Sequence, residues 1–269
     1  MLALLPPPLR IVHETSGLLF VDKPPGIAFH AASALGDPGV LTILRAQRDE
    51  DERLYSVHRL DRVTSGLLMV AKSAEAARTV STLLREGAIH KYYVALSARK
   101  PSKKMGKVSG DMERSRRGAW KLLRSAERPA VTSFSSFSVD VAASSATRDA
   151  PALRGFILKP QTGRTHQLRV ACKCLGSPIL GDALYANAQD AAAEERAYLH
   201  ATALRVPAGH AALSGDAAAP IEVLCPPSEG AAFSTPAFRA AWDGWFGSVP
   251  QPGGGGVWFD GTPVASRLE

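Results

Sequence analysis

Short apolar runs recur along the chain with the length and composition of β-strands. They are rich in β-branched and aromatic residues, and Gly, Pro or polar clusters bound them. The spacing predicts strands over residues 17–22, 67–71, 90–98, 130–139, 153–159, 198–206 and 221–224. Most of these runs follow one another without a helix long enough for a parallel crossover. This order predicts an α+β fold with a largely antiparallel mixed sheet and flanking helices.

Two segments show helical spacing instead. Residues 73–86 begin at Ser73, a favoured N-cap residue, and stop before Gly87. Residues 165–175 stop before Gly176. The apolar positions are Ala76, Val80, Leu83 and Leu84 in the first segment, and Leu168, Cys172 and Leu175 in the second. Each set lies on one side of a helix, so each helix is predicted to pack one face on a core.

The remaining segments set the expected domain limits. We expect one catalytic domain over residues 17–226, an N-terminal extension over 1–16, and a C-terminal helix with a flexible tail over 227–269. Residues 141–151 and 186–196 are typical of surface loops, and residues 250–256 of a flexible linker. The aromatic residues that favour a packed C-terminal helix are Trp242, Trp245 and Phe246.

Positive charge is concentrated in one segment. The chain has 269 residues, of which 45% are hydrophobic, and a net charge of +7. Residues 99–128 carry eleven basic and three acidic residues, a net +8, which leaves −1 for the rest. The basic residues are Arg99, Lys100, Lys103, Lys104, Lys107, Arg114, Arg116, Arg117, Lys121, Arg124 and Arg128. Such a segment suits a phosphate backbone, although the charge run by itself favours a solvated loop kept polar for solubility.

The sequence predicts neither a metal site nor a membrane segment. Cys172, Cys174 and Cys225 form no disulfide framework and lack the spacing of a zinc site. Five of the seven histidines, at 13, 30, 166, 200 and 210, are too scattered to indicate a metal site. Residues 1–5 are too short for the apolar core of a signal peptide, and no apolar stretch reaches the roughly 20 residues that span a bilayer. We therefore expect a soluble cytoplasmic protein.

One stretch carries the candidate chemistry. Residues 55–72 read YSVHRLDRVTSGLLMVAK and place Asp61 between Arg59 and Arg62, just before a buried strand. Nearby positive charge favours the ionised carboxylate, which suits a nucleophile or an electrostatic stabiliser better than a proton donor. From spacing alone, a structural ion pair at the strand entrance is an equally good interpretation.

This stretch resembles the signature of the RluA family of pseudouridine synthases, in which His-Arg-Leu-Asp precedes Thr-Ser-Gly and a Leu-rich strand. Three further segments resemble that family's motifs in the same order: VDKPPGIA at 21–28, HKYYVAL at 90–96, and KPQTGRTHQLRV at 159–170, continuing to LGSPILGDALY at 175–185. Together they span roughly residues 18–206. The resemblance implies the family's fold, with a central catalytic cleft.

By position, the resemblance assigns roles to individual residues. Asp61 matches the catalytic carboxylate, and Arg169 matches the basic residue that pairs with it. Tyr93 matches the tyrosine that stacks on the target base, with Tyr92 as the alternative; strand alternation places only one of them in the site. The expected RNA-binding residues are Arg62, His58, Arg59, Arg164, Lys103, Lys104, Arg116 and Arg117. His58 and Arg59 are expected mainly to shape the loop of the aspartate.

The implied reaction needs no cofactor and no metal. It breaks the bond between C1′ and N1 of a uridine, turns the freed uracil, and joins C5 to C1′. Asp61 either attacks C1′ or assists an elimination through a glycal. The uridine must first be flipped out of the folded RNA, at a cost of a few kcal/mol.

The resemblance leaves the RNA open. Either transfer RNA or ribosomal RNA fits, and we expect the protein to act as a monomer. Ala171 stands where better-known members have His, the basic segment is unlike that of the major ribosomal enzymes, and nothing before Leu18 resembles an S4-like module. These departures predict a divergent branch.

Two other functions are consistent with parts of the sequence. One is an RNA-binding or chaperone protein that keeps the fold without catalysis. The other is a glycosidase that uses Asp61, but that chemistry usually needs a second carboxylate across the bond. The segments around Tyr93 and Arg169 supply none.

Overall fold

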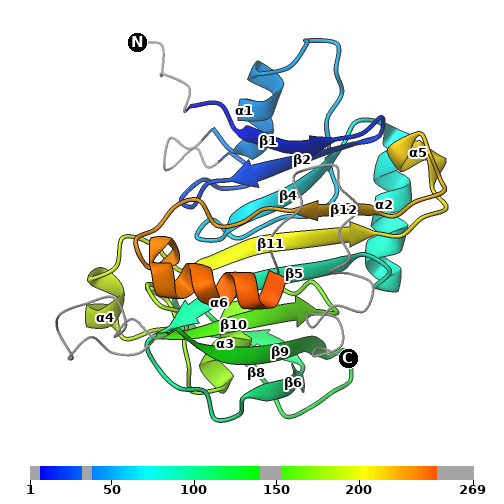
Figure 1. Cartoon of the computed structure of the whole chain (residues 1–269). Helices are drawn as coiled ribbons and strands as arrows, with labels where there is room; N and C mark the ends of the chain where they lie inside the picture. The colour runs from blue at the N-terminus through cyan, green and yellow to red at the C-terminus, as the bar shows by residue number, and fades with distance from the viewer. Residues whose placement is uncertain (1–6, 32–37, 140–152, 247–269) are drawn as a thin grey trace. The chain divides into compact units, whose positions relative to one another are not determined.

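The computed structural model describes residues 7–31, 38–139 and 153–246 of the chain. Two compact units make up the structure (Figure 1). The first comprises Met1–Ile89 and Ala201–Pro226, and the second comprises His90–His200 and Pro227–Glu269. Each unit contains a sheet with antiparallel strand pairs and packed helices, so the predicted α+β class is confirmed.

The first unit is built on a sheet of the order β1-β2-β4-β11, with β3 paired to β4 and β12 paired to β11. The printed pairs of β1 with β2, β2 with β4, and β11 with β12 are all antiparallel. The strands are β1 (Arg10–Glu14), β2 (Leu18–Lys23), β3 (Tyr55–Ser56), β4 (Ser65–Ala71), β11 (Leu199–Val206) and β12 (Ile221–Leu224). Every residue of β4 is buried, which explains its continuous apolar sequence.

Three helices belong to the first unit: α1 (Val40–Ala46), α2 (Ala74–Glu86) and α5 (Ala211–Ser214). Helix α2 packs on β4 and α5. Its first turn is capped because Ser73 Oγ accepts a hydrogen bond from the Ala76 backbone N–H at 3.0 Å. Gly87 ends the helix in the left-handed conformation, with φ of 73°. Both ends lie where the sequence predicted them.

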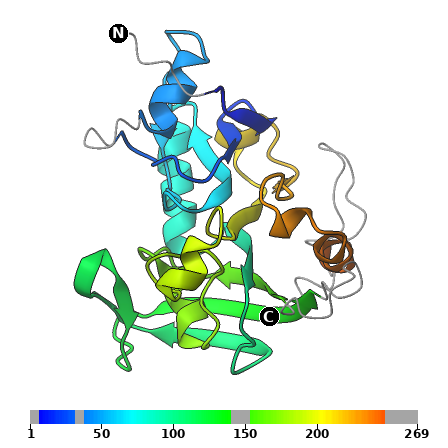
Figure 2. The ribbon, with the colours of Figure 1, turned by 90° about the vertical axis from the view of Figure 1, so that its left-hand side faces the viewer.

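The second unit holds the strand order β5-β10-β9-β6 and a separate two-stranded ribbon of β7 and β8. Helices α6 and α3 lie on opposite faces of this sheet (Figures 1 and 2). The strands are β5 (His90–Ser97), β6 (Met105–Gly110), β7 (Met112–Arg114), β8 (Trp120–Leu122), β9 (Ala130–Val139) and β10 (Leu153–Pro160). The helices are α3 (Gln167–Cys174), α4 (Ala188–Ala192) and α6 (Pro236–Phe246), with 3₁₀ turns η2 (Arg116–Gly118) and η4 (Ala232–Ser234).

All seven predicted strands and both predicted helices are present. Helix α6 lies in the C-terminal segment, and within it Trp242 stacks on Phe246 with ring centroids 4.2 Å apart. The side chain of Trp245 and residues 141–151 and 250–256 lie outside the described residues. The single domain over 17–226 stays a prediction.

One of the segment assignments was wrong. Residues 186–196 are not simply a surface loop, because they contain α4, whose N-cap Asn187 accepts a hydrogen bond from the Gln189 backbone N–H at 3.0 Å. Residues 1–16 include β1, which pairs with β2. Helix α1, strand β3 and the three strands β6, β7 and β8 of the basic segment were not predicted. Within the described part of the chain, no helix is both long and apolar enough to cross a bilayer.

Candidate active site

Asp61 lies in the turn that leads into β4 of the first unit, and its side chain is half-buried. Its backbone carbonyl accepts a hydrogen bond from the Thr64 N–H at 3.0 Å, which closes the turn. Gly66 follows with φ of 98°, a conformation that favours glycine. A Cβ at Gly66 would lie 2.2 Å from the Ala201 carbonyl oxygen. The glycine therefore lets the chain leave the Asp61 turn and enter the sheet.

A buried lysine ties the Asp61 turn to a second turn of the same unit. Lys23 is 0% exposed, and its Nζ donates to the carbonyl oxygens of Pro24 at 2.8 Å, Ile27 at 3.0 Å and Arg62 at 3.3 Å. The Gly26 N–H donates to the Arg62 carbonyl at 2.8 Å, and Arg62 Nε donates back to the Gly26 carbonyl at 2.6 Å. The rigid turn over 24–26 thus clamps the residue next to Asp61.

The other predicted residues of this loop have different surroundings. His58 Nε2 accepts a hydrogen bond from the Met69 backbone N–H at 2.9 Å, so this ring nitrogen carries no proton and the ring braces the loop against β4. Arg59 and Arg62 are exposed. Four sequence-predicted residues therefore share one loop: His58, Arg59, Asp61 and Arg62.

The candidate tyrosine lies on β5 of the second unit. Tyr93 is opposite Leu158 of β10, and the side chains of Tyr92 and Tyr93 are both buried. Successive strand residues point to opposite faces, so the two rings lie on opposite sides of the sheet. Lys159 Nζ lies 5.7 Å from the centroid of the Tyr92 ring. The choice of Tyr93 over Tyr92 stays a prediction.

Arg169 is buried on α3 in the second unit and is held by Asp182. Its Nε donates to Asp182 Oδ2 at 2.7 Å and its Nη2 to Oδ1 at 2.8 Å, and the two side chains are 7% and 1% exposed. The guanidinium also lies 5.0 Å from the centroid of the Tyr185 ring. Sequence reasoning missed Asp182, although it stands in the Leu-Gly-Asp-Ala-Leu-Tyr segment of the third motif. The expected pairing of Arg169 with Asp61 stays a prediction.

Gln167 fixes the turn that precedes Arg169. Its Oε1 accepts hydrogen bonds from Thr162 Oγ1 at 2.8 Å and from the Arg164 backbone N–H at 2.9 Å. Its Nε2 donates to the Val131 carbonyl at 3.0 Å and to Thr132 Oγ1 at 2.9 Å. Four bonds from one buried amide hold the start of α3 against β9.

The predicted RNA-binding residues of the second unit are on its surface. The exposed side chains are Lys103, Lys104, Arg116, Arg117 and Arg164. Asp111 orders the end of the basic segment, because its carboxylate accepts the backbone N–H groups of Glu127 at 3.0 Å and Arg128 at 2.8 Å. Hydrogen bonds from Ser125 and from these amides lower the pKa of Asp111. The basic segment is thus a set of strands and pinned turns.

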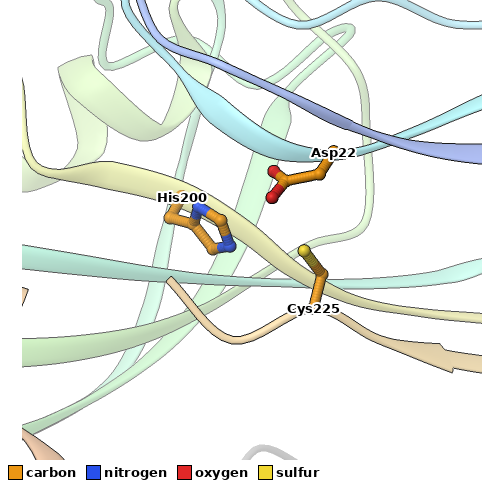
Figure 3. A group of neighbouring side chains, drawn as sticks. All are labelled: Asp22, His200 and Cys225. Carbon is orange, nitrogen blue, oxygen red and sulfur yellow. The ribbon is translucent and has the colours of Figure 1, made fainter. Parts of the chain in front are cut away.

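Figure 3 draws three side chains of the kinds that ligate metals: Asp22, His200 and Cys225. In the first unit, Arg10 Nη2 donates to Asp22 Oδ2 at 2.9 Å and to Cys225 Sγ at 3.3 Å. Burial raises the pKa of the Cys225 thiol, which disfavours the thiolate that a metal requires. In the second unit, the His200 ring lies 6.3 Å from that of Phe233. The Arg10 guanidinium, in contact with both Asp22 and Cys225 of the first unit, disfavours a cation beside these two side chains.

Comparisons with known proteins agree with these motifs. The sequence profile of the family described as RNA pseudouridylate synthase matches residues 17–173. A Haemophilus influenzae protein named as an uncharacterized RNA pseudouridine synthase is 46% identical over 196 residues, which cover 73% of this chain and 81% of that protein. The Escherichia coli protein named dual-specificity RNA pseudouridine synthase RluA is 35% identical over 208 residues, covering 74% and 87%.

A solved structure has the same fold. The human RNA pseudouridylate synthase domain containing 1 superposes with a TM-score of 0.64 at 25% identity, and the match covers 81% of this chain and 83% of that one. The profile match includes the Asp61 loop, the β5 tyrosines and Arg169. The chain therefore belongs to the RNA pseudouridylate synthase family and is an RluA-like RNA pseudouridine synthase.

Proposed function

We propose that this chain isomerises specific uridines of structured RNA to pseudouridine, with Asp61 as the carboxylate that acts on the ribose. The observation that carries the proposal is the fixed position of the Asp61 turn. A fully buried lysine and the two hydrogen bonds between Arg62 and Gly26 hold it. A carboxylate held in this way loses little freedom when it meets C1′ of a bound nucleotide.

The other candidate residues have complementary roles in the proposal. The ionised Asp61 either forms a bond to C1′ as N1 departs or assists an elimination through a glycal. Tyr93 packs against the detached uracil and accepts the proton that C5 loses on joining C1′. Arg169, fixed by Asp182, supplies positive charge for the carboxylate. All atoms of the product come from the uridine, so the reaction needs no cofactor or metal.

The substrate is proposed to be transfer RNA or ribosomal RNA. The Escherichia coli relative is named for dual specificity, and a Haemophilus ducreyi relative, 32% identical over 203 residues, is named ribosomal large subunit pseudouridine synthase C. The exposed basic residues of 99–128 and Arg164 offset the cost of flipping a base by contacting phosphates. We further propose that the protein acts as a monomer in the cytoplasm.

A survey of pseudouridines in a deletion strain tests the proposal. Transfer and ribosomal RNA from the deletion strain and its parent are compared by mass spectrometry, and the strain is complemented with the native gene or with Asp61→Asn. The proposal predicts that one or a few pseudouridines vanish and return only with the native gene. An unchanged pseudouridine map would instead favour an RNA-binding protein without catalysis. Release of free sugar or base would favour a glycosidase.

A further inference from the structure

A groove of about 470 Å³ lies within the second unit, beside the ribbon of β7 and β8. Its volume is in the range of roughly 300–1,000 Å³ typical of small-ligand sites. The residues that line it are Asp111, Met112, Trp120, Glu127, Arg128, Gly163, Arg164 and Thr165. None of them has a role in the catalytic chemistry described above.

Trp120 forms an aromatic surface in this groove. It is only half-buried, unlike Trp242 of the C-terminal helix. Its backbone N–H donates to Tyr185 Oη at 2.8 Å, and the Arg114 guanidinium lies 5.9 Å from the centroid of its ring. The backbone bond fixes the start of β8 and does not depend on the indole. The half-buried Trp120 thus lines the groove while Arg114 lies over its ring, an arrangement in which the remaining exposed part of the indole can stack on a base.

Other lining residues of the groove supply guanidinium groups and space. Arg164 Nη2 donates to the Arg128 carbonyl at 3.3 Å, which joins the turn over 161–165 to the end of the basic segment. Both arginine side chains are exposed. A Cβ at Gly163 would meet no atom within 4 Å, so this wall leaves open room where another residue would place a side chain.

The side chain of Tyr185 lies between Trp120 of the groove and the candidate catalytic residue Arg169. Tyr185 Oη, which accepts from Trp120, is also 2.9 Å from His166 Nδ1. The ring of the same tyrosine lies 5.0 Å from the Arg169 guanidinium. A ligand on Trp120 would therefore lie close to the part of the site that Arg169 occupies.

We infer that this groove binds one unpaired nucleotide that flanks the target uridine, with its base on Trp120 and its phosphate on Arg164 and Arg128. This inference rests on the proposed function, since the ligand is part of the RNA substrate. Aromatic stacking combined with nearby guanidinium groups is how proteins hold single-stranded nucleotides. The net positive charge of residues 99–128 favours an RNA strand over an apolar peptide.

Acidic residues in the groove bear on which base fits. The Asp111 oxygens already accept backbone amides. Glu127 is exposed, and its carboxylate is able to accept a hydrogen bond from the amino group of a base.

The test measures KM and kcat for pseudouridine formation by the full chain, with transfer and ribosomal RNA from the deletion strain as substrate. Trp120→Leu is expected to raise KM about tenfold, within the range for losing one stacked base, with kcat little changed. Trp120→Phe should restore most of the affinity. Arg164→Gln should also raise KM, whereas Arg239→Gln on α6, an exposed arginine elsewhere in the unit, should not.

The outcomes separate this inference from the proposed function. A native KM for Trp120→Leu in an active enzyme overturns the inference alone, as does an equal effect of Arg164→Gln and Arg239→Gln. If the native chain forms no pseudouridine in any RNA, the proposed function fails. The same variants are then compared by fluorescence anisotropy with a labelled RNA stem-loop, where a native affinity for Trp120→Leu again overturns the nucleotide site.

Discussion

Removing the carboxylate that holds Arg169 should cost the second unit much of its stability. In Asp182→Ala the guanidinium of α3 stays buried but loses two hydrogen bonds of 2.7 and 2.8 Å. The two side chains are 7% and 1% exposed, so water does not replace the lost partner. Breaking a buried ion pair by deleting one partner costs about 3–5 kcal/mol. The loss of the Leu184 N–H bond to Asp182 Oδ1 adds to this cost.

Urea unfolding followed by tryptophan fluorescence measures this loss, because Trp120 and Trp242 both lie in the second unit. With a slope of about 2 kcal/mol/M, the unfolding midpoint should fall by about 1.5–2.5 M. The matched control is Asp190→Ala, whose carboxylate lies 4.0 Å from Arg99 with both side chains at least 60% exposed. An exposed pair of this kind contributes less than about 1 kcal/mol. Equal midpoints for the two variants would refute a stabilising role for the buried pair.

Three further predictions concern the first unit and a matched glycine. Lys23→Met should lower the melting temperature by several degrees and reduce kcat more than it raises KM, because three backbone carbonyls lose their donor and the Asp61 turn loosens. Calorimetry measures the melting temperature and steady-state kinetics measures kcat and KM. An unchanged kcat would contradict the positioning role of Lys23. Hydrogen bonds from Arg48 and Lys72 lower the pKa of Glu14 below its ordinary 4.5, so these bonds stabilise the folded protein above that pH and stop doing so as the pH falls through the lower folded-state pKa. Glu14→Gln should therefore be less stable than the native protein at pH 7 and lose less stability on acidification. Parallel curves of stability against pH for the two proteins would count against this ion pair. Gly66→Ala should destabilise the protein by more than about 1 kcal/mol in urea unfolding, because Gly66 has a positive φ and a Cβ there would clash with Ala201. The control Gly244→Ala in α6 should be neutral or stabilising in the same titration. Equal unfolding midpoints for the two variants would contradict the steric argument.

Local sequence signals were sufficient where a single element determines its own structure. Ser73 and Gly87 bracket α2 because a hydroxyl cap and a left-handed glycine act within one helix. The strands over 130–139 and 221–224 have their predicted bounds, and the side chains of the second alternate between buried and half-buried. His58, Arg59, Asp61 and Arg62 share one loop because they lie within five consecutive residues.

Features that depend on a partner distant in sequence were not predictable in the same way. The ribbon strands β7 and β8 have only three residues each, too few for a residue pattern to mark them as strands. Strand β1 is largely exposed and is defined by its pairing with β2. Asp182 lies 13 residues after Arg169, so no helical or strand spacing links them. The role of Lys23 likewise follows from three carbonyls that only the folded chain brings together.

The most direct test of the central claim is single-turnover release of tritium from RNA labelled at C5 of uracil. The C5 hydrogen is lost when C5 joins C1′, so its release counts isomerisations. Asp61→Asn should slow the release about a hundredfold or more, as expected for a positioned catalytic group, while Asp51→Asn, an exposed acid of the same unit, should match the native rate. Native-rate release by a folded Asp61→Asn protein would contradict the account.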